Sequence, residues 1–164
     1  MREVPINEAV SRRFPEQLFL LGSVDKKGKA NIMPIAWCML TSFDPFMVAI
    51  SVCKERYSHS LISQNREFTL AFPTADMKEE VLYCGTHSGR DVDKLKESGL
   101  KVMPAKKVKA PLIDQCNANL ECRLVAELDT GTNTIFVGEI LVAYISEQAR
   151  KRLYTLGVDR YGSI

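Results

Sequence analysis

The chain has 164 residues, of which 46% are hydrophobic and 26% charged, and its formal net charge is +2 at pH 7. This length suits one domain with its own core, here expected to cover residues 1–164, and the composition is that of a globular rather than a disordered protein. The near-neutral charge offers no basic field for a nucleic acid, and no segment approaches the roughly 20 apolar residues of a membrane helix.

The first half of the chain alternates short apolar runs with turn residues, a pattern typical of β-strands. The predicted strands cover residues 19–24, 30–33, 35–41, 46–52 and 67–72. The turn at 25–29 predicts a hairpin, and Pro34 is expected to end the second strand before the third one begins. Ser58 is expected to cap a short helix that runs to about Asn65.

Helical periodicity follows over residues 77–98, in two pieces separated by a polar loop at 85–89. Asp91 is expected to cap the second piece and Gly99 to end it. The last third contains a strand at 120–128 with alternating side chains, a turn, and a partner strand at 135–145. Because this partner strand is apolar on both faces, we expect helices or a second subunit to cover it. About seven antiparallel strands with a few short helices predict a mainly β fold, a closed or nearly closed barrel.

Two polar segments could bind an anion. In segment 51–60 a strand ends and a helix begins, where free backbone N–H groups attract anions, Arg56 adds a donor fork, and Ser58 and Ser60 add hydroxyl groups. This set suits a phosphate monoester, while an ordinary helix cap beside a solvated arginine is the alternative. Segment 85–94 offers Arg90 and Lys94 to a phosphate or a substrate, or is an ordinary surface loop.

The segment 37–42 places an indole, a thiol, a thioether and hydroxyl groups on a strand that leads into a loop. A planar aromatic cofactor could lie against such an edge, whereas the alternative assigns Trp37 and Met39 to the core. Cys38 is a candidate redox-active thiol, although no second cysteine or activating cation lies near it in the sequence.

Other catalytic plans lack their motifs. The chain has no G-x-S-x-G elbow, no P-loop and no G-x-G-x-x-G fingerprint. The 5 cysteines are an odd number and include no C-x-x-C pair, which argues against a disulfide framework and a zinc knuckle. With only 2 histidines, a histidine-rich metal site is excluded as well. Acidic residues and Pro5 precede any apolar run, so we expect no signal peptide and a cytoplasmic location. So little acid–base equipment suits an enzyme whose cofactor carries the hard chemistry.

Four stretches in order, across roughly residues 15–146, resemble the flavin reductase-like FMN-binding split-barrel family, with the flavoredoxin branch as the nearest. They are the strand at 31–37, the Thr41-Ser42-Phe43-Asp44-Pro45 turn with the strand after it, the Arg56-Tyr57-Ser58 helix start with Glu67-Phe68 beyond it, and the loop at 88–94. The ordered set is more specific than any of its members.

This resemblance implies an antiparallel Greek-key split β-barrel and a homodimer with one FMN per subunit near the interface. The flavin would carry the chemistry of an FMN-dependent oxidoreductase, passing electrons to a protein, ferric or flavin acceptor, with NAD(P)H as a candidate donor. The implied cofactor-binding residues are Trp37, Cys38, Met39, Leu40, Thr41, Ser42, Ser51, Val52, Arg56, Ser58, Ser60 and Lys94.

The chain departs from the family pattern at three places. Reductases that use NAD(P)H often carry Asp-His before the last long strand, where this chain has Thr132-Asn133-Thr134, and this weakens the case for a nicotinamide pocket. Ser58 replaces a threonine, and Ala71-Phe72 stands where an asparagine is common. Two alternatives therefore stay open: an NAD(P)H:flavin reductase that uses FMN as a diffusible substrate, and a non-catalytic module that binds FMN or haem.

Overall fold

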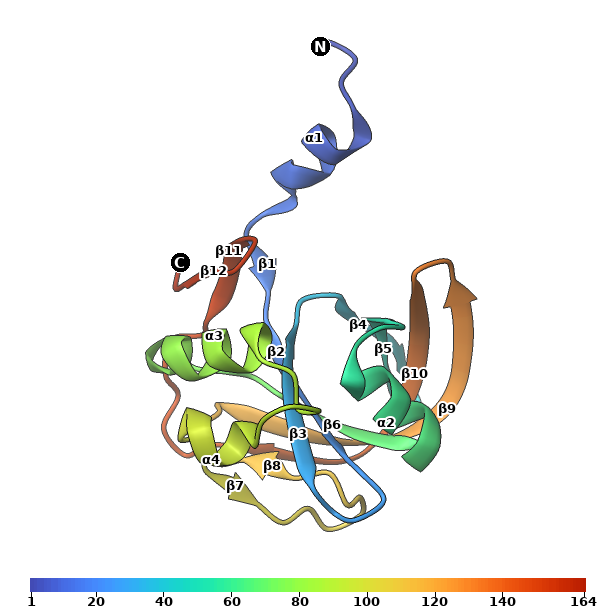
Figure 1. The fold of residues 1–164 in the computed structure, drawn as a ribbon, viewed down its shortest axis with the longest axis vertical. Helices are drawn as coiled ribbons and strands as arrows, with labels where there is room; N and C mark the ends of the chain where they lie inside the picture. The colour runs from blue at the N-terminus through green and yellow to red at the C-terminus, as the bar shows by residue number, and fades with distance from the viewer.

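The computed structural model describes residues 1–164, and a curved seven-stranded sheet forms its body (Figure 1). Neighbouring strands run antiparallel in the order β3-β2-β6-β9-β10-β5-β4. The strands are β2 (Phe19–Val24), β3 (Ala30–Ile35), β4 (Cys38–Phe43), β5 (Phe46–Cys53), β6 (Glu67–Ala71), β9 (Ala118–Thr130) and β10 (Asn133–Ile145). The edge strands β3 and β4 follow each other in the chain without pairing, so the barrel is split, which confirms the predicted mainly β fold.

Short helices and strands surround this barrel. The helical elements are α1 (Ile6–Val10), η1 (Ser11–Arg13), α2 (Tyr57–Asn65), η2 (Ala75–Met77), α3 (Lys78–Thr86) and α4 (Lys94–Ser98). The remaining strands are β1 (Glu16–Gln17), β7 (Val102–Met103), β8 (Leu112–Ile113), β11 (Tyr154–Gly157) and β12 (Arg160–Gly162). None of the helices combines the length and the hydrophobicity needed to cross a bilayer.

Two apolar clusters hold the fold together, and β2 contributes to both because successive side chains point to opposite faces. The barrel interior contains the fully buried Leu21, Ile50, Phe68 and Phe136. A second cluster, outside the barrel, joins β2 and β3 to α3 and to the C-terminal segment through Leu20, Ile32, Val81 and Leu153. Burying β2 on both faces explains why all of its residues are apolar or small.

Several predicted boundaries were wrong, among them the strand predicted at 35–41, since Ile35 belongs to β3 and β4 begins at Cys38. Pro34 stays inside β3, paired with Leu20, because β3 is an edge strand and a missing N–H is tolerated there. Helix α2 begins at Tyr57, one residue before the predicted cap, so Ser58 lies buried within its first turn. Helix α4 is capped by Asp93 rather than Asp91, because the Asp93 side chain accepts a hydrogen bond from the backbone N–H of Lys96.

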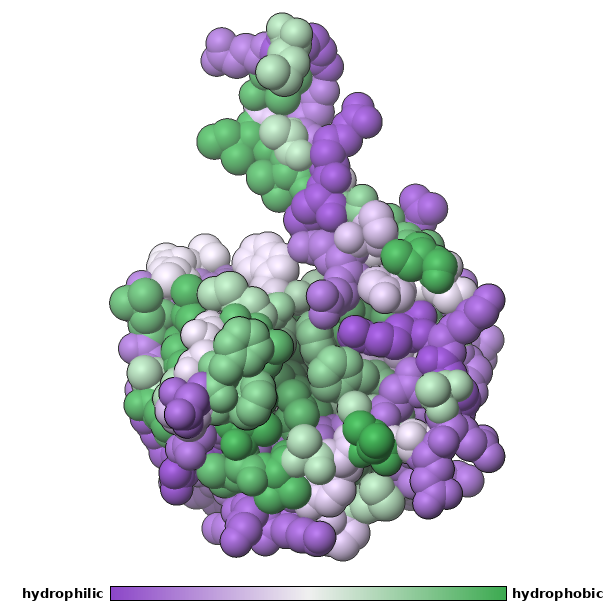
Figure 2. All heavy atoms as spheres, turned by 180° about the vertical axis from the view of Figure 1, so that it is seen from behind, coloured by the Kyte–Doolittle hydropathy of each residue, from purple (hydrophilic) through white to green (hydrophobic).

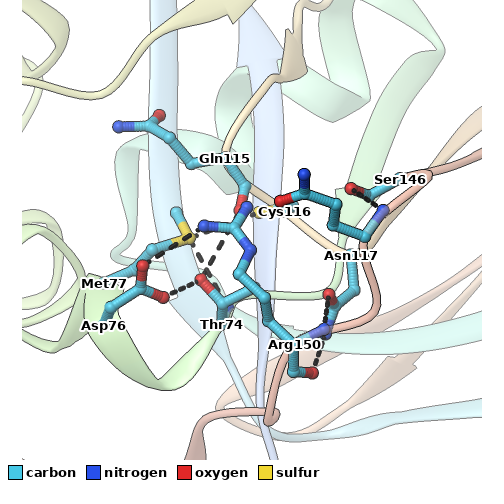
Figure 3. Close-up of polar contacts among 9 residues, drawn as sticks. Thr74, Asp76, Met77, Gln115, Cys116, Asn117, Ser146 and Arg150 are labelled. Atoms are coloured by element: carbon cyan, nitrogen blue, oxygen red, sulfur yellow. Dashed lines mark hydrogen bonds and ion pairs between the residues drawn. The ribbon is translucent and has the colours of Figure 1, made fainter.

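A polar network fastens the C-terminal segment to the body. Figure 3 shows Arg150 at its centre, donating to the Gln115 carbonyl at 2.6 Å and pairing with Asp76 at 3.2 Å. The backbone of Arg150 also exchanges two hydrogen bonds with the Asn117 side chain, at 2.7 and 3.0 Å. Beyond it, residues 151–153 make backbone hydrogen bonds to the segment before α3. These contacts fix the direction in which the chain enters the hairpin β11–β12.

Candidate functional site

Two adjoining cavities, each of about 390 Å³, lie along the split side of the barrel. The hairpin cavity is bounded by the link from β3 to β4, the end of β5, and the hairpin β11–β12. The polar cavity is bounded by the start of α2, the end of α3 and the loop that follows α3. Four residues line both cavities, namely Met33, Cys53, Arg56 and Gly85. The two cavities therefore form one groove with two chemically different ends.

The polar cavity gathers three cationic side chains from three segments. Arg56 stands at the start of α2, and Arg90 donates to the Glu55 carbonyl at 3.1 Å while lying over the Tyr57 ring. Lys94 is buried and donates to the carbonyls of Ile32 and Cys84. None of the three cations forms an ion pair. The arrangement thus offers positive charge that no carboxylate of the chain neutralises.

The protonation of Lys94 responds to this environment. Burial lowers the pKa of Lys94 below its ordinary value of 10.5, the nearby Cys84 opposes this shift, and the charge of Arg56 lowers the pKa further. An anion in the cavity would favour the charged ammonium form and raise this pKa again. The electrostatics of the cavity therefore match a negatively charged ligand.

An unpaired amide lies at the back of the polar cavity. Asn31, on β3, is 2% exposed, and its Nδ2 donates to the Ser58 Oγ at 2.8 Å. Its Oδ1 is buried and has no hydrogen-bond partner. Unsatisfied buried oxygens are rare in folded proteins, so this group requires a partner that the chain does not supply in this orientation. After the amide rotates, its NH2 group could donate to a phosphate oxygen in the cavity, and the Ser58 hydroxyl group could donate to Oδ1.

Gly89 has a steric role beside this amide. A Cβ at position 89 would come within 2.1 Å of the Asn31 Oδ1 and 3.0 Å of its Cγ. Only glycine lets the loop approach so closely, and this approach brings Ser88 and Arg90 to the cavity wall.

The hairpin cavity has a larger share of apolar surface than the polar cavity. Ile35, Trp37 and Val52 line it from the barrel. Asn133, at the start of β10, donates to the Ser51 Oγ at 3.0 Å on the same wall. Tyr161 closes the far side, where burial raises the pKa of its hydroxyl group. A flat aromatic group with polar edges fits such a lining.

The two cavities bring together six of the twelve predicted cofactor-binding residues, and a nearby hollow adds two more. Trp37, Ser51, Val52 and Arg56 line the hairpin cavity, and Arg56, Ser58 and Lys94 line the polar cavity. The hollow is lined by Trp37, Cys38, Met39 and Ser51. Leu40, Thr41, Ser42 and Ser60 line neither cavity. The Ser60 hydroxyl donates instead to the Tyr57 carbonyl at 2.8 Å. A role for these four residues stays a prediction.

Cys38 is a poor candidate for a reactive thiol in this setting. Burial raises its pKa to about 12, and the nearby positive charge of Arg152 opposes that shift only in part. The thiolate, which is the nucleophilic form, is therefore scarce near neutral pH. All five cysteines are free, and no group of three or more His, Cys, Asp and Glu side chains is arranged to hold a metal.

Sequence reasoning missed Asn31, Gly89 and the terminal hairpin. Asn31 and Gly89 lie in two of the stretches that carry the family resemblance, but they were not named as site residues, because they meet only after β3 and the loop beyond α3 pack together. The hairpin β11–β12 follows the last long strand through an irregular link, so no periodic pattern in the sequence predicted it. The short Tyr-rich stretch with glycines at 154–162 was the one available signal.

Comparison with known proteins gives a consistent result. The family model for the flavin reductase like domain matches residues 11–164. An uncharacterized protein from Archaeoglobus fulgidus is 41% identical over 128 residues, which cover 78% of this chain and 71% of that protein. The structure of a flavoredoxin from Methanosarcina acetivorans is similar with a TM-score of 0.86 and 33% identity, covering 100% of this chain and 92% of that one. The flavoredoxin of Desulfovibrio vulgaris (Miyazaki F) is similar with a TM-score of 0.86 and 26% identity, covering 100% and 93%.

Proposed function

We propose that this chain, which belongs to the flavin reductase like domain family, is an FMN-dependent oxidoreductase of the flavoredoxin type. The observation that carries the proposal is the groove, in which the polar cavity with its three cations without ion pairs adjoins the more apolar hairpin cavity. A flavin mononucleotide has the matching parts, a phosphate dianion at one end and a planar aromatic ring system at the other. The flavoredoxins among the similar structures support the same cofactor class.

The polar cavity would hold the phosphate group. Arg56 can present two N–H donors, and the backbone N–H groups at the start of α2 add positive potential. Lys94 uses two of its three donors on carbonyls, which leaves one for the ligand. The unpaired Asn31 amide and the Ser88 hydroxyl group complete a set of donors and acceptors around a phosphate ester.

The hairpin cavity would hold the ring system. Trp37 and Val52 provide apolar contact and exclude water, while the Ser51–Asn133 pair provides hydrogen-bonding groups for ring heteroatoms. Bound FMN supplies reversible hydride and single-electron transfer, chemistry that no side chain of the protein provides. The chain's own residues bind and orient the cofactor, and no protein general base is assigned. We propose electron delivery to a protein, ferric or flavin acceptor, with NAD(P)H as a candidate donor.

We also propose a homodimer and a cytoplasmic location. The outer faces of β4 and β5 expose large apolar side chains, which supports a second copy as their cover. Five free cysteines suit a reducing compartment.

A flavin titration tests the proposal. We expect the purified protein to show a flavin absorbance band, or to acquire one after FMN is added, with saturation at one FMN per chain. The replacement Arg56→Met should weaken the binding of FMN far more than that of riboflavin, because riboflavin lacks the phosphate group. Absence of any flavin uptake would refute the proposed cofactor. Bleaching of the band by NADH without oxygen would identify a nicotinamide donor, and an unchanged band would assign reduction to another redox protein.

A further inference from the structure

The N-terminal arm, residues 1–14, extends away from the body that it precedes (Figure 1). Its helix α1 packs mainly on the following turn η1, and none of its residues is buried. Ile6 and Val10, four residues apart and thus on one side of the helix, are 82% and 46% exposed. A five-residue helix does not persist alone in water, so the arm needs a surface to pack against.

The body carries an apolar surface with no cover from its own chain. The β4–β5 face is our name for the side of the hairpin β4–β5 that carries Trp37 and Met39, which are both more than half exposed and line one hollow. The exposed side chains of Leu40, Phe43 and Phe46 lie on the rest of this hairpin. Figure 2 shows apolar side chains gathered on this side of the body, and others on the arm. The outward side chain of Ile135 on β10 borders the same area. Contiguous apolar patches of this kind mark contact surfaces in soluble proteins.

The arm starts at the border of this face. Glu16, two residues after the arm, lines a hollow of about 320 Å³ together with Trp37, Met39 and Ile135. In a dimer with two-fold symmetry every contact occurs twice, so an arm of one copy that reaches the β4–β5 face of the other is matched by the reverse contact. An arm that begins at the border and leaves its own body then continues over the second copy.

We propose that two copies exchange their N-terminal arms, so that Ile6 and Val10 of each copy pack against the β4–β5 face of the other. This inference rests on the homodimer of the proposed function and adds how the dimer is held. It also links the dimer to the groove, because Arg13 and Phe14 at the base of the arm line the hairpin cavity. Docking of the arm would fix this part of the cavity wall, where Arg13 forms an ion pair with Glu16 at 2.9 Å.

The first test places charge on the apolar side of the arm. We expect the full-length double variant Ile6→Asp/Val10→Asp to dimerise about tenfold more weakly or worse, since burying carboxylates against apolar side chains is unfavourable. The matched control, Asn7→Asp/Ser11→Asp, adds the same charges with the same spacing on an exposed polar side of the arm and should dimerise like the wild type. Sedimentation equilibrium gives the dissociation constants, with flavin content held equal in all samples.

The second test distinguishes exchange from an arm that folds back on its own chain. Trp37 is the single tryptophan of the chain, so the wavelength of its fluorescence emission reports whether the β4–β5 face is exposed to water. Emission from Ile6→Asp/Val10→Asp should shift to longer wavelength than that of the wild type. Adding excess full-length Trp37→Phe protein, which is silent but has an intact arm, should restore the shorter wavelength in mixed dimers.

Each outcome has one meaning. A wild-type protein that stays monomeric overturns both the homodimer and the exchange. A dimer that the double variant leaves as strong as the control overturns the exchange alone. An emission shift that the Trp37→Phe protein does not reverse shows that the arm packs on its own chain, which also overturns the exchange. Flavin uptake is measured separately and decides the cofactor proposal.

Discussion

The replacement Gly89→Ala tests whether the Asn31 amide and the loop beyond α3 together form the phosphate pocket. The added Cβ would lie 2.1 Å from the Asn31 Oδ1, about 1.3 Å inside the 3.4 Å at which ordinary contact begins. The Asn31 side chain is fixed by its hydrogen bond to Ser58, so either this bond breaks or the loop moves away. Ser88 and Arg90 flank Gly89 and line the cavity, so a shift of the loop would displace both from the ligand. We therefore expect the strain to lower the affinity for FMN.

Overpacking of this kind costs about 1–3 kcal/mol, which corresponds to a roughly 5- to 150-fold weaker affinity. We expect this loss for FMN and little change for riboflavin, both measured by quenching of flavin fluorescence. The control Gly131→Ala has φ +77 in the native protein and no atom within 4 Å of its new Cβ. It should lower thermal stability through backbone strain while leaving the affinity for FMN unchanged.

A double-mutant cycle makes the reasoning refutable. Asn31→Ala removes both atoms that the new Cβ of Gly89→Ala would approach most closely. We therefore expect Gly89→Ala to cost much less FMN affinity in the Asn31→Ala background than in the wild type. Equal losses in the two backgrounds, or a single Gly89→Ala variant that binds FMN normally, would show that the contact does not shape the phosphate pocket.

Three further predictions follow from other groups. Tyr161→Phe removes a hydroxyl group that has no partner in the chain, and should weaken the binding of FMN and of riboflavin alike by about 3- to 10-fold in the same fluorescence assay. Tyr154→Phe, outside both cavities, is the control, and a loss of affinity for FMN alone would contradict the placement of Tyr161 beside the ring system. For the buried Glu121, burial raises the pKa but hydrogen bonds from Tyr144 and from the backbone N–H groups of residues 106–108 outweigh it, so the pKa lies below the ordinary 4.5. The stability that this carboxylate provides is therefore present above pH 4.5 and is lost as the pH falls through the lowered pKa; in thermal melts Glu121→Gln should be less stable than the wild type at neutral pH, with a difference that shrinks in acid, and a constant difference would contradict the pKa shift. Because burial raises the pKa of Cys38 to about 12, iodoacetamide at about pH 8 should leave this thiol unmodified in the folded protein and alkylate it in guanidinium, as mass spectrometry of the peptides will show.

The barrel could be predicted because its strands carry local signals. The runs at 19–24 and 46–52 are rich in apolar residues and bounded by turn residues, since β2 is buried on both faces and β5 buries residues 48–50 and Val52. The error at Pro34 has the opposite cause. Proline weakens a strand only where its N–H would be needed, and whether β3 lies at an edge depends on pairing that the local sequence does not contain.

The candidate site was only half predictable for a related reason. Arg56 and Ser58 lie at a strand-to-helix junction, where chemistry and position coincide in a few consecutive residues. The partners that complete the pocket come from far along the chain. Asn31 reaches Ser58 across 27 residues, and Lys94 reaches the Ile32 carbonyl across 62. No pattern of spacing encodes such contacts, so the sequence predicted Lys94 as a candidate without its partners.

The small net charge of +2 concealed the feature that most directly indicates function. Arg56, Arg90 and Lys94 line one cavity, and the hydrogen-bonded partners of the last two are neutral carbonyls rather than carboxylates. Burial of Lys94 beside the charge of Arg56 opposes folding, because the buried cation loses water without gaining an opposite charge. The arrangement becomes favourable when a dianion enters, and by linkage the ligand then stabilises the folded chain. Stability alone gives no reason to gather these charges, so their convergence points to a bound phosphate.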